Sequence, residues 1–277
     1  MLPGNDDDHC FGRRPDAVFV VNRKRLLITG VITTVVVVAV VISLPWLHIY
    51  TGAAPPDQFY RPLSAPAEIP ARQVLGVAHN AGNNAATTAA ALRYGADVIE
   101  IDVITARGTL VAGRAQGWPW LAGLIFRGQT LASAWQHAAA AKVIKLDLQQ
   151  NGRGLLDSLV RFLDEHPGHS VMVSTRDAAA IEYLRPRLPA AVMLLFSVPF
   201  PHAVAQIRRD GALTNAVGGI SVFQGLVDAN LVRWAHSRNL VVLAWTVNDS
   251  NHLNQQLHLG VDGITTGNLA ILQALSG

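Results

Sequence analysis

The sequence contains little cysteine and little charge, and both shortages limit what the chain can be. One cysteine, Cys10, is present among 277 residues, so disulfides cannot stabilise the fold and a packed core must do so. Charged residues make up 15% of the chain and hydrophobic residues 50%, a balance which suggests that part of the sequence lies in lipid. The net charge of +3 comes mostly from scattered residues, without a basic block interleaved with aromatic residues, and no nucleic-acid partner is expected.

One apolar run is long enough to cross a membrane. Residues 26–44 carry no charge, and about 20 apolar residues span a bilayer as a helix. Three basic residues at 23–25 precede the run and none follows it until Arg61, which predicts a single-pass cell-membrane protein with a cytoplasmic N-terminus. A cleaved signal peptide is the alternative, but its apolar core would be about 7–15 residues long. The predicted order is a cytoplasmic tail (1–25), a transmembrane helix (26–48), a linker (49–71) and one extracytoplasmic domain (72–277).

Beyond the linker, short β-branched apolar runs alternate with longer helical stretches. This alternation predicts βαβ units and a parallel sheet, and strands that are apolar throughout indicate that both faces of the sheet are covered. The predicted strands are 74–79, 97–103, 109–113, 143–148, 170–175, 192–198, 219–223, 240–247 and 262–266, and the helices between them include 85–94, 131–141, 155–165, 178–184, 201–210 and 227–237.

Eight of these strands predict a closed (β/α)8 TIM barrel. The remaining run, 109–113, follows 97–103 too closely for a crossover helix, so the two should form an antiparallel hairpin. A doubly wound open sheet is the alternative, but no Gly-rich phosphate-binding fingerprint follows the first strand.

Polar side chains stand where several predicted strands end, and active sites of such barrels lie at the carboxyl ends of the strands. Glu100 and Asp102 are two residues apart, so in a strand they share one face. Asp147 ends another strand, and three converging carboxylates need a positive partner. A divalent cation is the simplest partner, and all-oxygen ligation favours Ca²⁺, Mg²⁺ or Mn²⁺. His79, at the end of the first strand, is the candidate for acid–base work.

Short motifs between Val74 and Gln273 follow the pattern of one known family. They read AHNAGNN, GADVIEIDV, QTLASAW, IKLDLQ, WTVN and GVDGITT. With these motifs the chain resembles the glycerophosphodiester phosphodiesterase family, metal-dependent (β/α)8-barrel enzymes that cleave glycerophosphodiesters into glycerol 3-phosphate and an alcohol. The resemblance implies that the substrate is a glycerophosphodiester or another phospholipid-derived small molecule. It also implies that His79 is one of two catalytic histidines, that Glu100, Asp102 and Asp147 hold the metal, and that Trp245 borders the substrate.

The chain departs from the family at several functional positions. The second catalytic histidine should end the hairpin, where this chain has Arg114. Arginine can bind a phosphate but cannot exchange protons near neutral pH. The family's arginine after the first histidine is Asn80 here, its lysine is Gln149, and its closing Thr-Asp is Thr266-Gly267. Arg114 and Gln149 therefore remain as candidate substrate-binding residues.

These departures leave two functions open. The first is a membrane-anchored phosphodiesterase with a degenerate second histidine. The second is an inactive barrel that binds a phosphorylated ligand, a lipid or a partner protein. A phospholipase D-type relative shares the barrel but also expects a second histidine. His202, directly after a predicted strand, is a candidate replacement if it faces the mouth of the barrel.

Overall fold

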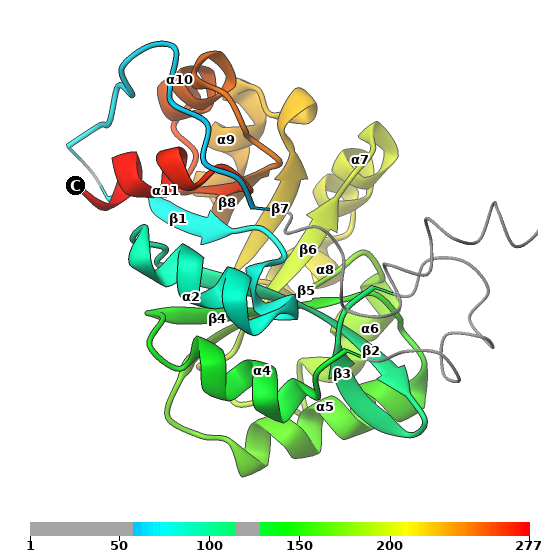
Figure 1. Cartoon of the computed structure of the whole chain (residues 1–277). Helices are drawn as coiled ribbons and strands as arrows, with labels where there is room; N and C mark the ends of the chain where they lie inside the picture. The colour runs from blue at the N-terminus through cyan, green and yellow to red at the C-terminus, as the bar shows by residue number, and fades with distance from the viewer. Residues whose placement is uncertain (1–57, 72, 115–127) are drawn as a thin grey trace, which may run out of the picture. The chain divides into compact units, whose positions relative to one another are not determined.

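Parallel strands close into a ring in the computed structural model, which describes residues 58–71, 73–114 and 128–277 (Figure 1). The first strand pairs with both the second and the last, so the predicted (β/α)8 barrel is confirmed. The ring runs in the order β1 (Leu75–Ala78), β2 (Val98–Ala106), β4 (Val143–Leu148), β5 (Ser170–Thr175), β6 (Met193–Val198), β7 (Gly219–Phe223), β8 (Val241–Trp245) and β9 (Gly263–Thr266).

Side chains alternate between the two faces of each barrel strand, as the pleat requires. On β2, Ile99 and Ile101 point outward into the main hydrophobic core, whereas Glu100 and Asp102 occupy the intervening, inward-facing positions. A second, smaller apolar cluster is centred on Met172, Leu195 and Leu243. These residues lie on the inward face, each two positions before a residue nearer the carboxyl end of its strand: Ser174, Ser197 and Trp245. The interior is therefore apolar below and polar near the carboxyl ends.

Amphipathic helices cover the outside of the ring (Figure 1), and polar side chains begin most of them. Asp249, for example, accepts a hydrogen bond from the backbone N–H of His252, which fixes the first turn of its helix. Three helices, over residues 211–216, 250–259 and 269–276, are present in addition to those named from the sequence. The described helices are α2 (Ala85–Arg93), α4 (Leu131–Ala138), α5 (Arg153–Glu165), α6 (Ala178–Leu184), α7 (Pro201–Arg209), α8 (Gly211–Ala216), α9 (Ala229–His236), α10 (Ser250–Leu259) and α11 (Leu269–Ser276), with short 3-10 turns η1 (Ala81–Asn83) and η2 (Gln224–Leu226).

The predicted hairpin is present and lies outside the ring. Strand β3 (Thr109–Ala112) pairs antiparallel with the second half of β2, and Arg107 and Gly108 turn the chain with positive φ. The hairpin extends β2 to Ala106, three residues past its predicted end, because those residues pair with β3. It delivers Arg114 to the carboxyl end of the barrel.

The segment before the barrel is hydrogen-bonded to it. The backbone of Phe59 pairs with Gly267 and Leu269, and Asn268 exchanges hydrogen bonds with the backbone of Arg61. Ser64 contacts the hydroxyl of Ser250 at the start of α10. Residues 49–57 of the predicted linker lie outside the described residues, as does the predicted transmembrane helix over 26–48. In the part of the chain that is described, no helix has the length and apolar character to cross a membrane.

Candidate active site

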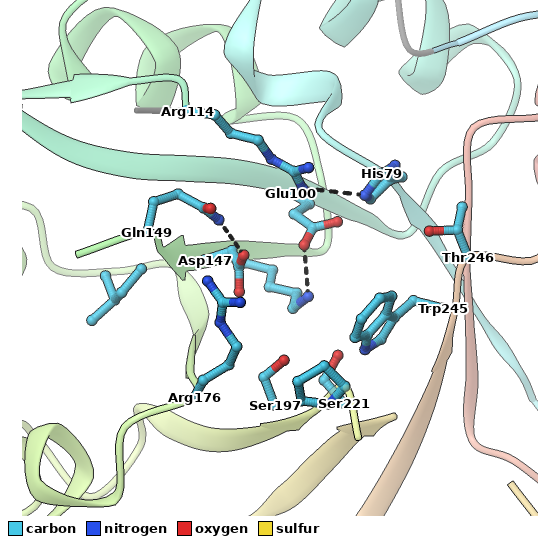
Figure 2. Close-up of a pocket in the computed structure, with 13 residues that line it drawn as sticks. His79, Glu100, Arg114, Asp147, Gln149, Arg176, Ser197, Ser221, Trp245 and Thr246 are labelled. Atoms are coloured by element: carbon cyan, nitrogen blue, oxygen red, sulfur yellow. Dashed lines mark hydrogen bonds and ion pairs between the residues drawn. The ribbon is translucent and has the colours of Figure 1, made fainter. Parts of the chain in front are cut away.

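A cavity of about 430 Å³ opens at the carboxyl ends of the barrel strands. Its walls are mostly polar, in contrast to the apolar layer deeper in the ring. Figure 2 shows His79 and Arg114 on one side of this space and Arg176, Ser197, Ser221 and Trp245 on the other.

His79 and Arg114 approach each other at the mouth. The backbone N–H of His79 donates to Thr266 on the last strand, which fixes the residue just beyond β1. Arg114 Nη2 lies 3.4 Å from His79 Nε2 and 3.0 Å from Asn80 Oδ1. Because a guanidinium has only donors, the contact with His79 makes Nε2 the acceptor. Asn80 adopts the left-handed conformation with φ of 55°, which asparagine tolerates better than most residues.

Asp102 lies behind the cavity wall, fully buried and held by three side chains. Its Oδ2 accepts from Arg114 Nε at 2.9 Å and from Asn83 Nδ2 at 2.6 Å, and its Oδ1 accepts from Gln149 Nε2 at 2.8 Å. Burial raises the pKa of Asp102 to about 7, and the nearby carboxylates add to the rise, although Arg114 and Asn83 act against it. This carboxyl group therefore takes up a proton near neutral pH.

Glu100 forms an ion pair with Lys145 inside the barrel. Lys145 Nζ lies 2.8 Å from Glu100 Oε1, with 3% and 5% of the two side chains exposed. Burial alone would raise the pKa of Glu100, but nearby positive charge, chiefly that of Lys145, together with the hydrogen bond from Lys145, outweighs burial and holds the pKa below its usual value. Burial would lower the pKa of Lys145, yet the adjacent carboxylates keep the pKa above its usual value. Both groups are therefore charged at neutral pH.

Asp147 stands one strand away from Asp102, opposite it in the register of β2 and β4. Its Oδ2 accepts from Gln149 Nε2 at 2.5 Å, and its Oδ1 accepts from the hydroxyl of Ser174. Gln149 thus bridges two of the three carboxylates. Trp245, at the end of β8, packs edge-to-face against Phe223 with ring centroids 5.7 Å apart.

The predicted site residues meet in this one place, with a different arrangement from the one expected. His79, Glu100, Arg114, Asp147, Gln149 and Trp245 line the cavity, and Asp102 contacts two of them from behind. Yet among the described residues no three His, Cys, Asp or Glu side chains have the geometry to hold a metal ion. The three carboxylates bind donors of the chain itself instead, so the residues as arranged do not fit a divalent cation.

Two other residues near the strand ends, the predicted candidate His202 and Asn248, have different surroundings. His202 is exposed on α7, where it stacks on Phe200, and it does not line the cavity. Asn248 fixes the loop after β8, because its Oδ1 accepts from Thr266 Oγ1 at 3.1 Å and from the backbone of Gly267 at 2.9 Å.

Lys145 and Arg176 line the cavity but were not among the predicted site residues. The signal for Lys145 was available, since it lies two residues before Asp147 in an apolar strand and so shares its inward face. Arg176 directly follows β5, so its position after a strand end could also have selected it. Ser197 and Ser221 are inward-facing positions of β6 and β7, but a serine in an apolar run gives too weak a signal to select.

A closed parallel barrel with an ionisable cavity at the carboxyl ends of its strands defines a (β/α)8-barrel protein of the enzyme type. The model of the glycerophosphoryl diester phosphodiesterase family matches residues 129–270, just over half of the chain. The chain belongs to this family of phosphoric diester hydrolases.

Individual relatives agree with this assignment. A segment of 56 residues is 41% identical to glycerophosphodiester phosphodiesterase GDPD4 of Arabidopsis thaliana, covering 20% of this chain and 17% of that protein. The fold is similar to an Oleispira antarctica phosphodiesterase in complex with the product sn-glycerol-3-phosphate (TM-score 0.59, 16% identity, 74% of this chain and 96% of the other). It is also similar to a glycerophosphodiester phosphodiesterase of Agrobacterium tumefaciens (TM-score 0.56, 15% identity, 74% and 100%).

Proposed function

We propose that this barrel hydrolyses phosphodiesters of the glycerophosphodiester class, with His79 as its acid–base residue. The observation that carries the proposal is the cavity at the strand ends, where His79 lies 3.4 Å from Arg114 and opposite Arg176. Phosphoryl transfer needs a group that exchanges protons and groups that stabilise negative charge. The imidazole can exchange protons, and the guanidinium groups carry a permanent positive charge. The product complex of the Oleispira relative supports a glycerol phosphate ligand for this cavity.

The chain's own residues suggest how the reaction would proceed. Arg114 and Arg176 neutralise the phosphoryl oxygens, because both carry permanent charge at the mouth. His79 takes a proton from the attacking oxygen as that oxygen approaches phosphorus. Of the histidines in the described ranges, His79 alone lines the cavity, so the leaving alkoxide takes its proton from His79 or from water. We therefore expect slower turnover than an enzyme with an acid and a base on opposite sides would show.

A hydrolysis assay on the purified full-length chain tests the proposal. The substrates are glycerophosphodiesters and a chromogenic phosphodiester, each with Ca²⁺, Mg²⁺, Mn²⁺ or EDTA. We expect His79→Ala to lower kcat by about 10²-fold or more, the size of a lost acid–base contribution. His202→Ala is the matched control, since His202 is exposed and outside the cavity, and it should leave kcat unchanged. If His79→Ala hydrolyses these substrates as fast as the wild type, the assignment of His79 as the acid–base residue is refuted.

The second candidate function is phosphate-ester binding without turnover. Arg114 favours it, because an arginine stands where the resembling family has its second histidine. Calorimetric titration with sn-glycerol 3-phosphate separates the candidates. Binding without hydrolysis under any of the cation conditions supports the binding function.

We further propose that residues 26–48 anchor the chain in the cell membrane with the barrel on the extracytoplasmic side. The support is the uncharged run and the basic residues at 23–25. Fractionation of cells with alkaline extraction, followed by protease digestion of intact cells, tests the anchor and its orientation. Recovery of a soluble chain whose N-terminus lies beyond residue 48 would show a cleaved signal peptide instead.

A further inference from the structure

Lys145 occupies a position where a lysine is costly to bury. It is the third residue of β4, flanked in the barrel wall by Glu100 on β2 and Met172 on β5. Only 3% of its side chain is exposed, so its ammonium has lost most of the water that would solvate a free lysine, although it still lines the cavity. Such a group is tolerated when it is paired, and its partner is Glu100 Oε1 at 2.8 Å.

The carboxylates of the cavity have little capacity left for a metal. Both oxygens of Asp102 and both oxygens of Asp147 accept hydrogen bonds from side chains of the chain. Glu100 Oε1 binds Lys145, and Glu100 Oε2 is the one oxygen of the three groups without a partner in the described ranges. Hard cations such as Ca²⁺ need about six to eight oxygen ligands, and one free oxygen with ordered water is a poor substitute.

Fixed positive charges also balance this group of acids. Lys145 and Arg114 each form an ion pair with a carboxylate, and Arg176 lines the same cavity. Three carboxylates therefore face three cationic side chains. A divalent ion bound to Glu100 would lie close to the ammonium of Lys145, which is 2.8 Å from Glu100 Oε1, and the two cations would repel each other.

We infer that Lys145 takes the place of the divalent cation in this barrel, so that the cavity holds its phosphate ester with built-in charges alone. Its ammonium binds Glu100 Oε1, an oxygen that a metal would need as a ligand. Together with Arg114 and Arg176, Lys145 supplies the positive charge of the cavity. The statement about phosphate rests on the proposed function, whereas the statement about metal does not.

Mn²⁺ binding tests the inference without any enzymatic reaction. The full-length wild type, Glu100→Gln, Lys145→Met, and Lys145→Met with Glu100→Gln are titrated with Mn²⁺, and the free ion is followed by electron paramagnetic resonance. Lys142→Met is the matched control, because Lys142 pairs with Asp97 outside the cavity and is 66% exposed. We expect the wild type and Lys142→Met to show no Mn²⁺ site that depends on Glu100. Lys145→Met should bind Mn²⁺ about tenfold more tightly or better, since the repelling charge is gone, and Glu100→Gln should remove the gain.

Two results would overturn the inference. One is a Mn²⁺ site in the wild type that Glu100→Gln abolishes. This comparison needs no Lys145 variant, so it remains valid even if Lys145→Met fails to fold. The other is a folded Lys145→Met, judged by circular dichroism, that binds no more Mn²⁺ than the wild type. The proposed function fails separately, if hydrolysis is absent under every condition. Hydrolysis that EDTA abolishes would leave the proposed function standing and overturn the role of Lys145.

Discussion

The buried ion pair between Lys145 and Glu100 leads to a quantitative prediction about stability. Lys145→Met removes the ammonium but leaves the carboxylate in the barrel, with 5% of its side chain exposed. At 2.8 Å and an effective dielectric constant of about 20, the lost attraction amounts to about 6 kcal/mol before solvation is considered. Part of this loss is recovered when Glu100 takes up a proton or water enters. Measured losses from breaking such pairs are about 3–5 kcal/mol, which is the expected decrease in unfolding free energy.

Thermal unfolding followed by circular dichroism provides the assay. For a domain of this size, each kcal/mol shifts Tm by about 2–4 °C, so Lys145→Met should lower Tm by about 6–20 °C. Replacing both partners, Lys145→Met with Glu100→Met, should restore most of the loss, because no buried charge then remains unpaired.

The exposed pair of Lys142 and Asp97 is the control. Its 2.6 Å separation is as short, but the solvated lysine should make the pair worth about 0–1 kcal/mol, so Lys142→Met should shift Tm by at most about 4 °C. The reasoning is refuted if Lys145→Met and Lys142→Met have the same Tm. It also fails if the double variant is less stable than Lys145→Met alone, because the two buried groups would then be uncoupled.

Two further predictions concern the surroundings of the cavity. The pKa of Asp102 is about 7 in the folded chain and near 4 in the unfolded chain. Protonation of Asp102 therefore stabilises the fold, fully below about pH 4, and this stabilisation is lost as the pH rises through 7. A carbon-13 carboxyl titration by NMR should give a midpoint near 7, Arg114→Met should raise it further, and a midpoint near 4 would contradict the burial argument. Gly82→Ala should destabilise the chain by about 1–3 kcal/mol in urea unfolding, because the added Cβ would lie 2.3 Å from Ile101 Cγ1 and 3.0 Å from the backbone oxygen of Glu100; an unchanged urea midpoint would show that η1 can move away from β2.

The barrel was predictable because its strands are short β-branched runs with helices between them. Most strand ends agree with the prediction within one or two residues, and β2 is longer because its pairing with β3 is a non-local contact. The positions of His79, Glu100 and Asp147 at the mouth followed from the same pattern, since strand ends meet at one edge of a barrel.

The interactions of the site side chains could not be predicted in this way. Spacing places Glu100 and Asp102 on one face, but it does not say whether their oxygens bind a metal, Lys145 or Arg114. That choice depends on how far each long side chain reaches across neighbouring strands, and on burial that only the closed ring produces. The same limitation applies to Gln149, whose amide bridges two acids.

The apolar cluster of Met172, Leu195 and Leu243 within the ring has a kinetic consequence. It fills the barrel beneath the cavity, so traffic through the lower end is blocked and ligands enter and leave by the same opening. A product that still occupies the opening excludes the next substrate molecule. For the proposed hydrolysis we therefore expect competitive inhibition by the phosphorylated product, so that progress curves bend earlier than substrate depletion alone would require.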